Sequence, residues 1–189
     1  MYLPSSPRFV NLTCHPRELE ALRDFINELD SKPDGWDVNS TGDCCEWEGI
    51  TCSSSLHLND PDKKTLRITK LKLVNKKIVR FSGEIPDVFD TLHELEYLMA
   101  KSNRFSGGIP KSLANSQSLI LLNLGNNSLS GPLYLNCAVM TNLASLDLGT
   151  NKFNSSFPEY LPSCRHLHYV NLGRYHQGRA QGQKKNFNF

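Results

Sequence analysis

The chain has 189 residues, of which 39% are apolar and 21% are charged, and its net charge is +2. This length suits one globular domain or a short repeat array. The near-neutral charge argues against a dedicated nucleic-acid-binding protein, and no apolar run reaches the roughly 18 residues that a membrane-spanning helix needs. The sequence also lacks the motifs of a protein kinase.

The first segment, residues 1–13, is expected to be disordered. Its opening residues combine neither a basic region nor an apolar stretch, so we interpret them as lacking a secretory signal peptide. A helix is predicted over residues 16–29, because its apolar residues recur on one face, with Pro16 in the first turn. These apolar residues are Leu19, Leu22, Phe25, Ile26 and Leu29.

Four of the six cysteines lie around this helix: Cys14, Cys44, Cys45 and Cys52. Four cysteines allow three pairings, and the adjacent Cys44 and Cys45 are poorly placed to pair with each other. We therefore expect disulfides Cys14–Cys44 and Cys45–Cys52, which indicate an oxidising compartment. A zinc site is disfavoured, because the segment has no C-x2-C pair and no histidine at ligand spacing. Residues 14–80 are predicted to form a cap over the apolar end of a repeat array.

The first strand of the sheet is predicted at residues 69–73. The segment from 63 to 80 carries eight bases and no acid: Lys63, Lys64, Arg67, Lys70, Lys72, Lys76, Lys77 and Arg80. We interpret it as a solvated face, because Lys70 and Lys72 alternate with apolar Leu71 and Leu73. The alternative is attraction for a sulfated peptide or an acidic wall polysaccharide.

The 27 leucines and 17 asparagines of the chain indicate an internal repeat. Over residues 81–173 the leucines recur with a period of about 24 residues, as in Leu98, Leu122 and Leu146. This pattern is a leucine-rich repeat of the plant extracellular type. It predicts an α/β solenoid of about four coils behind a disulfide-stapled helical cap, with a parallel sheet on the concave side.

Asparagines recur at the same period, at Asn103, Asn127 and Asn151. They follow the predicted strands, at the point where the chain turns away from the sheet. A buried amide at such a position is expected to bond the backbone N–H and C=O groups that the turn leaves unpaired.

The candidate ligand surface consists of the strand positions that point away from the core. These positions are Tyr97, Met99, Lys101, Leu121, Asn123, Ser145, Asp147, Tyr169 and Asn171. Solenoid proteins bind along their concave surface, so we predict a peptide or protein ligand here, the alternative being an ordinary solvated face. His166 and His168 have no third ligand for a metal, and no catalytic set is spaced in the sequence, so we predict no metal, no cofactor and no enzyme activity.

Three further expectations concern the repeats and the tail. Cys137 is predicted to be a buried free thiol, because it takes the register of Leu113 and Leu161; a Cys137–Cys164 disulfide is the alternative. Four sequons indicate N-glycosylation of a secretory protein, at Asn11, Asn39, Asn126 and Asn154. Residues 174–189 are expected to form a disordered basic tail, which leaves an open apolar edge at the last coil and favours self-association.

Several segments resemble the plant phytosulfokine receptors. They are residues 14–25, 32–36, 44–52, 73–77, 82–89, 108–116, 126–131 and 145–151. In that family the ectodomain binds a short tyrosine-sulfated peptide hormone, pairs with a co-receptor kinase, and signals through a membrane helix and a kinase domain. The resemblance implies an extracellular peptide-binding module at the outer face of the plasma membrane. The alternatives are a secreted defence-type leucine-rich repeat protein and an inactive truncated product.

The sequence also departs from the family. The spacing between the cap strand and its equivalent in the next coil is longer than the repeat period, as the positions of Leu71 and Leu98 show. We interpret this excess, near Val79 and Arg80, as the trace of an internal deletion of several repeats. The insertion that carries the hormone contact in the family, the membrane helix and the kinase have no counterpart in the sequence, so we expect a truncated ectodomain fragment.

Overall fold

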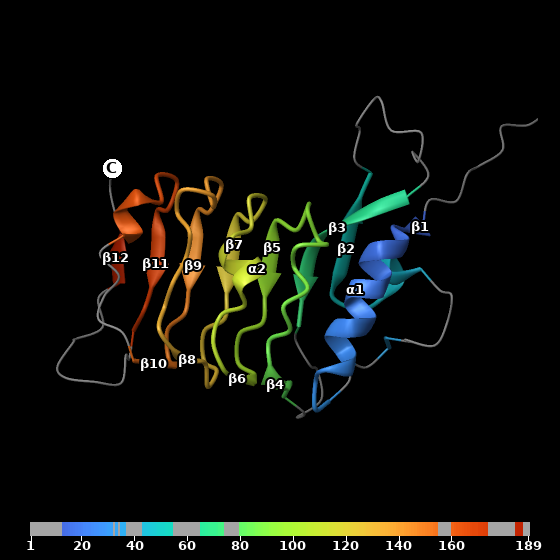
Figure 1. Ribbon diagram of the computed structural model, residues 1–189, viewed down its shortest axis with the longest axis horizontal. Helices are drawn as coiled ribbons and strands as arrows, with labels where there is room; N and C mark the ends of the chain where they lie inside the picture. The colour runs from blue at the N-terminus through green and yellow to red at the C-terminus, as the bar shows by residue number, and fades with distance from the viewer. Residues whose placement is uncertain are drawn as a thin grey trace, which may run out of the picture.

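The structure, a computed structural model, describes residues 13–31, 33, 35–36, 43–54, 65–73, 80–154, 160–173 and 184–186. These residues form a solenoid of stacked coils with a helical cap at its amino-terminal end (Figure 1). The predicted fold class, a plant-type leucine-rich repeat with an N-terminal disulfide-stapled cap, is confirmed. Of the expected disordered segment 1–13, only Thr13 is described, and it begins the first strand.

The cap contains β1 (Thr13–Cys14), α1 (Pro16–Asn27), the 3-10 helix η1 (Cys44–Glu46), β2 (Ile50–Ser53) and β3 (Thr65–Lys72). Strand β3 pairs in parallel with β1 and antiparallel with β2. It begins earlier in the chain than predicted, and α1 ends before the predicted Leu29. The apolar face of α1 is buried as expected, so the helix closes the end of the core.

The main sheet continues from β3 into the repeats through β5 (Tyr97–Met99), β7 (Leu121–Asn123), β9 (Ser145–Asp147) and β11 (Tyr169–Asn171). These strands are all parallel, and Leu98, Leu122, Leu146 and Val170 stand side by side in them. Leu71 of β3 pairs with Leu98 in the same column, although the spacing between them exceeds the repeat period. The sheet therefore crosses the irregular junction in register, and the extra residues lie outside the strands.

Short elements occupy the other sides of each coil. Two small parallel sheets join β4 (Ser82–Glu84) to β6 (Arg104–Ser106) and β8 (Ser130–Gly131) to β10 (Lys152–Phe153), along the lower side of the view in Figure 1. Helix α2 (Lys111–Ala114) and the 3-10 helix η2 (Leu161–Ser163) lie in the remaining connections. Each coil therefore buries its leucines against its neighbours in the stack, which for the first coil include the cap.

The asparagine column makes the hydrogen bonds expected from the sequence. The Asn103 carbonyl accepts from Phe81 N–H, and its amide donates to the carbonyls of Leu73 and Ala100. Asn127 and Asn151 repeat this pattern one and two coils further on. Every buried amide thus satisfies backbone groups of its own coil and of the preceding one.

The core changes character between the cap and the repeats. Ala100 stands in the column that Leu124 occupies in the next coil, and both are buried. The apolar space beside Ala100 is lined by the rings of Phe25, Phe89 and Phe105. Aromatic side chains from α1 and the first coil thereby fill the volume that the small alanine leaves.

The carboxyl-terminal edge of the sheet differs from the expectation. Within the expected disordered tail, Lys184–Asn186 form β12, which pairs antiparallel with β11; the rest of the tail lies outside the described residues. The backbone edge of β11 is therefore paired, whereas self-association through the expected apolar edge of the last coil stays a prediction. An antiparallel strand can cover an edge that the next parallel coil does not continue.

Candidate ligand-binding surface

The candidate surface consists of two rows on the outward face of the main sheet. Because parallel strands lie about 4.8 Å apart, residues at equal register are neighbours. The first row is Lys70, Tyr97, Leu121, Ser145 and Tyr169, and the second row is Lys72, Met99, Asn123, Asp147 and Asn171. The structure thus places the predicted strand residues on one face and adds the two lysines of β3 to them.

Asp147 is the most enclosed member of the second row, with only 6% of its surface exposed. Its Oδ1 accepts from Gly149 N–H at 3.1 Å and from the Asn171 amide at 2.9 Å. Its Oδ2 lies 3.6 Å from Lys101 Nζ. This carboxylate is therefore occupied by protein partners, and its contact with a ligand stays a prediction, as does that of its neighbours.

Glycines next to this row allow the aspartate and the asparagine to lie flat on the sheet. A Cβ on Gly125 would come within 2.8 Å of Asp147 Oδ1, and one on Gly149 within 2.7 Å of the Asn171 amide nitrogen. Asn123 and Asn171 each also accept the N–H two residues further on, as Asp147 does. The glycine column is a part of this surface that repeat spacing alone did not identify.

The first row carries aromatic and apolar side chains that are partly exposed: Tyr97, Leu121 and Tyr169. Lys70 Nζ lies 5.0 Å from the centre of the Tyr97 ring, a cation–π contact that fixes both side chains. Tyr169 stands at the other end of the row, three strands away. The row is a strip that can take an extended chain, with a cation at its cap end.

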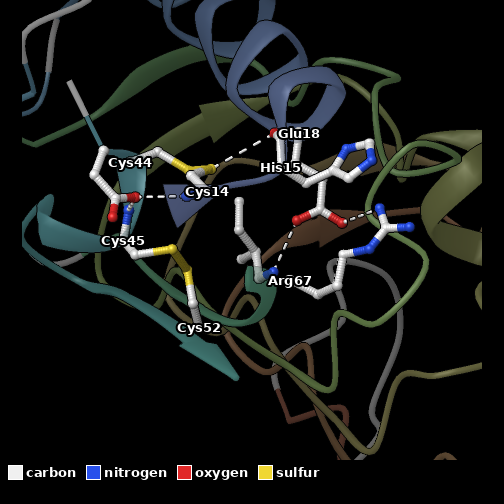
Figure 2. The surroundings of a disulfide bond; sticks show 9 residues. Cys14, His15, Glu18, Cys44, Cys45, Cys52 and Arg67 are labelled. Atoms are coloured by element: carbon white, nitrogen blue, oxygen red, sulfur yellow. Dashed lines mark hydrogen bonds and ion pairs between the residues drawn. A yellow bond between two sulfur atoms is a disulfide. The ribbon is translucent and has the colours of Figure 1, made fainter. Parts of the chain in front are cut away.

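Two of the disulfides lie in the cap. Cys14 is joined to Cys44 and Cys45 to Cys52, the pairing that the sequence predicts (Figure 2). Asp43 Oδ1 accepts from the backbone N–H groups of both Cys14 and Cys45. Three of these sulfurs come close enough to resemble a metal site, but each is already in a disulfide.

A buried carboxylate joins the cap helix to the sheet. Glu18 is fully buried, and it accepts from Ile68 N–H at 2.8 Å and from the Arg67 guanidinium at 3.2 Å (Figure 2). Burial raises the pKa of this carboxyl group, although the Ile68 and Arg67 contacts oppose the rise. Arg67, a member of the basic segment, is thus a structural partner.

The raised pKa of Glu18 predicts a pH-dependent stability. The folded state binds the proton more tightly than the unfolded state, so the contribution is fully present below about pH 4.5 and is lost as pH rises through the folded pKa. We expect the midpoint of urea unfolding to change less with pH in Glu18→Gln than in the native chain across this window. The exposed control Glu20→Gln should keep the pH dependence of the native chain. Equal slopes for all three chains would contradict this prediction.

Comparison with known proteins identifies the relatives of the chain. Residues 15–53 match the leucine rich repeat N-terminal domain. Over 91 residues the chain is 61% identical to phytosulfokine receptor 1 of Arabidopsis thaliana, which is 48% of this chain and 8% of that protein. Over this stretch the chain is similar to the leucine-rich repeat ectodomain of the phytosulfokine receptors. It spans less than a tenth of the length of that receptor, and the matched part is a repeat region without catalytic function.

Solved ectodomains of Arabidopsis thaliana share the fold of this chain. A chain of the BIR3–SERK2 complex superposes with a TM-score of 0.68 at 26% identity, over 82% of this chain and 80% of that chain. The ectodomain of the membrane receptor kinase GASSHO1/SCHENGEN3, solved with CASPARIAN STRIP INTEGRITY FACTOR 2, gives 0.68 at 26% identity, over 83% of this chain and 18% of that chain. None of the helices described in the present chain is long and apolar enough to cross a membrane.

One of the cysteine predictions made from the sequence is wrong. Cys137 is joined to Cys164 instead of being a free thiol. Both cysteines are buried in successive coils, with a Cα–Cα distance of 4.6 Å. Tyr160 strengthens the same junction, because its hydroxyl donates to the Leu133 carbonyl and accepts from Leu135 N–H. The two cysteines are 27 residues apart, which differs from the repeat period, so the repeat register favoured the free thiol over this alternative.

The structure describes some of the remaining sites that the sequence predicts. Asn126 and Asn154 are exposed, and Asn126 adopts a positive φ of 57° in the turn after β7. Asn11 and Asn39 lie outside the described residues, as do Lys63, Lys64, Lys76 and Lys77 of the basic segment. His168 Nδ1 lies 3.2 Å from the His166 carbonyl, in an exposed stretch before β11. Glycans on Asn126 and Asn154 remain predictions.

Proposed function

We propose that this chain acts by binding, as the extracellular peptide-recognition module of a phytosulfokine-receptor-like protein. The observation that carries the proposal is the 61% identity to phytosulfokine receptor 1, in a chain whose sheet presents a continuous polar and aromatic strip. The structural likeness to GASSHO1/SCHENGEN3, solved with a bound factor, supports a binding role for this kind of surface.

Three further features support an extracellular place for the module. The three disulfides require an oxidising compartment. The exposed sequons at Asn126 and Asn154 fit a glycosylated surface. The likeness to a chain of the BIR3–SERK2 complex supports a second protein partner, which we propose to be a co-receptor kinase. We therefore place the module at the outer face of the plasma membrane.

The peptide is proposed to lie along the first row of the concave face. Leu121 stands at the middle of this row and is partly exposed, so it offers an apolar contact without being part of the core. Tyr97 and Tyr169 lie on either side of it in the row. Extended peptides bind such strips through side-chain contacts at alternate residues.

The test is a calorimetric titration of the secreted, disulfide-bonded chain with synthetic phytosulfokine. We expect saturable binding that Leu121→Arg abolishes, because this change places a charge and a long side chain in the middle of the row. The matched control is Tyr134→Arg, since Tyr134 is 61% exposed and lies outside both rows. Absence of saturable binding, or equal binding by the two variants, would rule out the proposed function.

A further inference from the structure

Three lysines, Lys70, Lys72 and Lys101, come from the first two strands at the cap end of the main sheet and the turn that follows them. Lys70 and Lys72 lie on β3, next to Tyr97 and Met99 of β5. Lys101 follows Met99 by two residues, in the turn after β5, and its Nζ lies 3.6 Å from Asp147 Oδ2. Lys72 at the end of β3 and Lys101 just beyond β5 are therefore carried by two adjacent strands.

These ammonium groups are available to a ligand. Lys72 is exposed, and the side chain of Lys101 is 55% exposed. Among the described residues, neither Lys70 nor Lys72 forms an ion pair with a carboxylate. Lys70 is held over the Tyr97 ring, which keeps a third positive charge on this face.

The ion pair of Lys101 is the weaker half of the Asp147 contacts. Asp147 is held by Gly149 and Asn171 through Oδ1, whereas Lys101 meets only Oδ2, at 3.6 Å. Asp147 lies two strands away from Lys101, with the small Gly125 below its carboxylate. Lys101 can therefore turn toward an arriving anion while Asp147 keeps its other two partners.

We propose that Lys72 and Lys101 bind an acidic side chain of an extended peptide ligand at the cap end of the concave face. The inference depends on the proposed function, because it assumes that the concave face is the peptide-binding surface. It adds a direction and a chemical class to that function. The acidic residue lies beside Met99, and an apolar residue further along the peptide reaches Leu121. Asp147 acts as an internal competitor that lowers the affinity of Lys101 for the ligand.

The experiment measures fluorescence anisotropy at low salt with two dye-labelled peptides, Gly-Ser-Glu-Glu-Gly-Leu-Gly-Ser and the same peptide with both glutamates replaced by glutamines. We expect the glutamate peptide to bind about tenfold more tightly, since each exposed ion pair contributes a few-fold. Lys72→Ala combined with Lys101→Ala should remove this preference. The control pair Lys111→Ala with Lys152→Ala, exposed lysines in α2 and β10, should keep it.

A second variant separates the anchor from a general loss of folding. Asp147→Asn keeps the size of the side chain and removes the charge that competes for Lys101. It should strengthen binding of the glutamate peptide about two- to three-fold, as expected for the loss of one exposed ion pair, and leave the glutamine peptide unchanged. A structural role alone would instead weaken both.

The outcomes distinguish the inference from the proposed function. Equal binding of the two peptides, a preference that survives the double lysine change, or binding of polygalacturonate but not of the glutamate peptide would overturn the anchor. Phytosulfokine binding that Leu121→Arg abolishes would still stand in that case. A lysine-dependent preference without any phytosulfokine binding would support the anchor and refute the hormone proposal.

Discussion

Gly49→Ala is expected to destabilise the cap by about 3 kcal/mol or more, because the new methyl group would meet the backbone. Gly49 has a φ of 86°, and a Cβ at this position would lie 2.2 Å from the Lys72 carbonyl oxygen. The carbonyl of the same glycine accepts a hydrogen bond from the Lys72 N–H at 2.7 Å. The two backbone segments therefore cannot move apart without losing this hydrogen bond. Strands β2 and β3 would have to part where the cap meets the sheet.

A matched glycine isolates the collision from the cost of the backbone conformation. Gly131 has a similar φ of 82°, but nothing lies within 4 Å of a Cβ built there. Gly131→Ala should therefore lower the free energy of unfolding only by the cost of holding an alanine in the left-handed backbone conformation, about 1–2 kcal/mol. Urea unfolding of both variants gives the comparison, and thiol labelling reports whether Cys52 in β2 has lost its disulfide with Cys45. Equal losses of stability would show that the β2–β3 contact tolerates the methyl group.

Asn151→Leu is expected to destabilise the repeats by about 3–5 kcal/mol, because it leaves three buried backbone groups without a hydrogen-bond partner. Leu129 N–H donates to Asn151 Oδ1 at 3.0 Å, and the amide donates to the carbonyls of Leu124 and Leu148 at 3.0 and 2.9 Å. Leucine has a similar volume and fits the apolar surroundings, so the loss comes from hydrogen bonding and not from a cavity.

The control for this prediction is Asn142→Leu. Asn142 is exposed and makes a single bond, to the Gln117 carbonyl at 2.9 Å, which water can replace. We expect a change of less than about 1 kcal/mol there. The free energy of unfolding from urea titration is the measurement for both. A loss at Asn151 no larger than that at Asn142 would mean that solvent reaches the turn and satisfies the backbone.

The two stability predictions differ in how far they could be foreseen. The role of Asn151 follows from the sequence, because the amide recurs with the leucines at a fixed period and only a turn has unpaired backbone groups to offer it. The role of Gly49 does not, because the carbonyl that excludes its Cβ belongs to Lys72, on a strand that pairs with β2 only after folding. Repeats make long-range contacts visible in the sequence, and the cap has no repeat.

The candidate surface shows the same division. Strand periodicity placed Tyr97, Asn123 and Tyr169 on one face, and the register of the sheet bears out that placement. It did not reveal that Asp147 is enclosed, since Asn171 and Lys101 approach it from coils on either side. It also did not reveal that Lys70 covers the Tyr97 ring, because the spacing between these two residues is longer than the repeat period.

By itself, the sequence determined the solenoid, its concave sheet, the inward leucine column and the buried amides, and it reduced the possible pairings of the cap cysteines to two. Each of these follows from local periodicity or from a small number of alternatives. The tertiary structure alone decided the Cys137–Cys164 disulfide, the strand at Lys184–Asn186 and the partners of Asp147 and Lys101. Apart from the contact of Asp147 with Asn171, which lie one repeat apart, those contacts join segments at separations that are not multiples of the repeat. They are set by how the coils stack and not by the pattern within one coil.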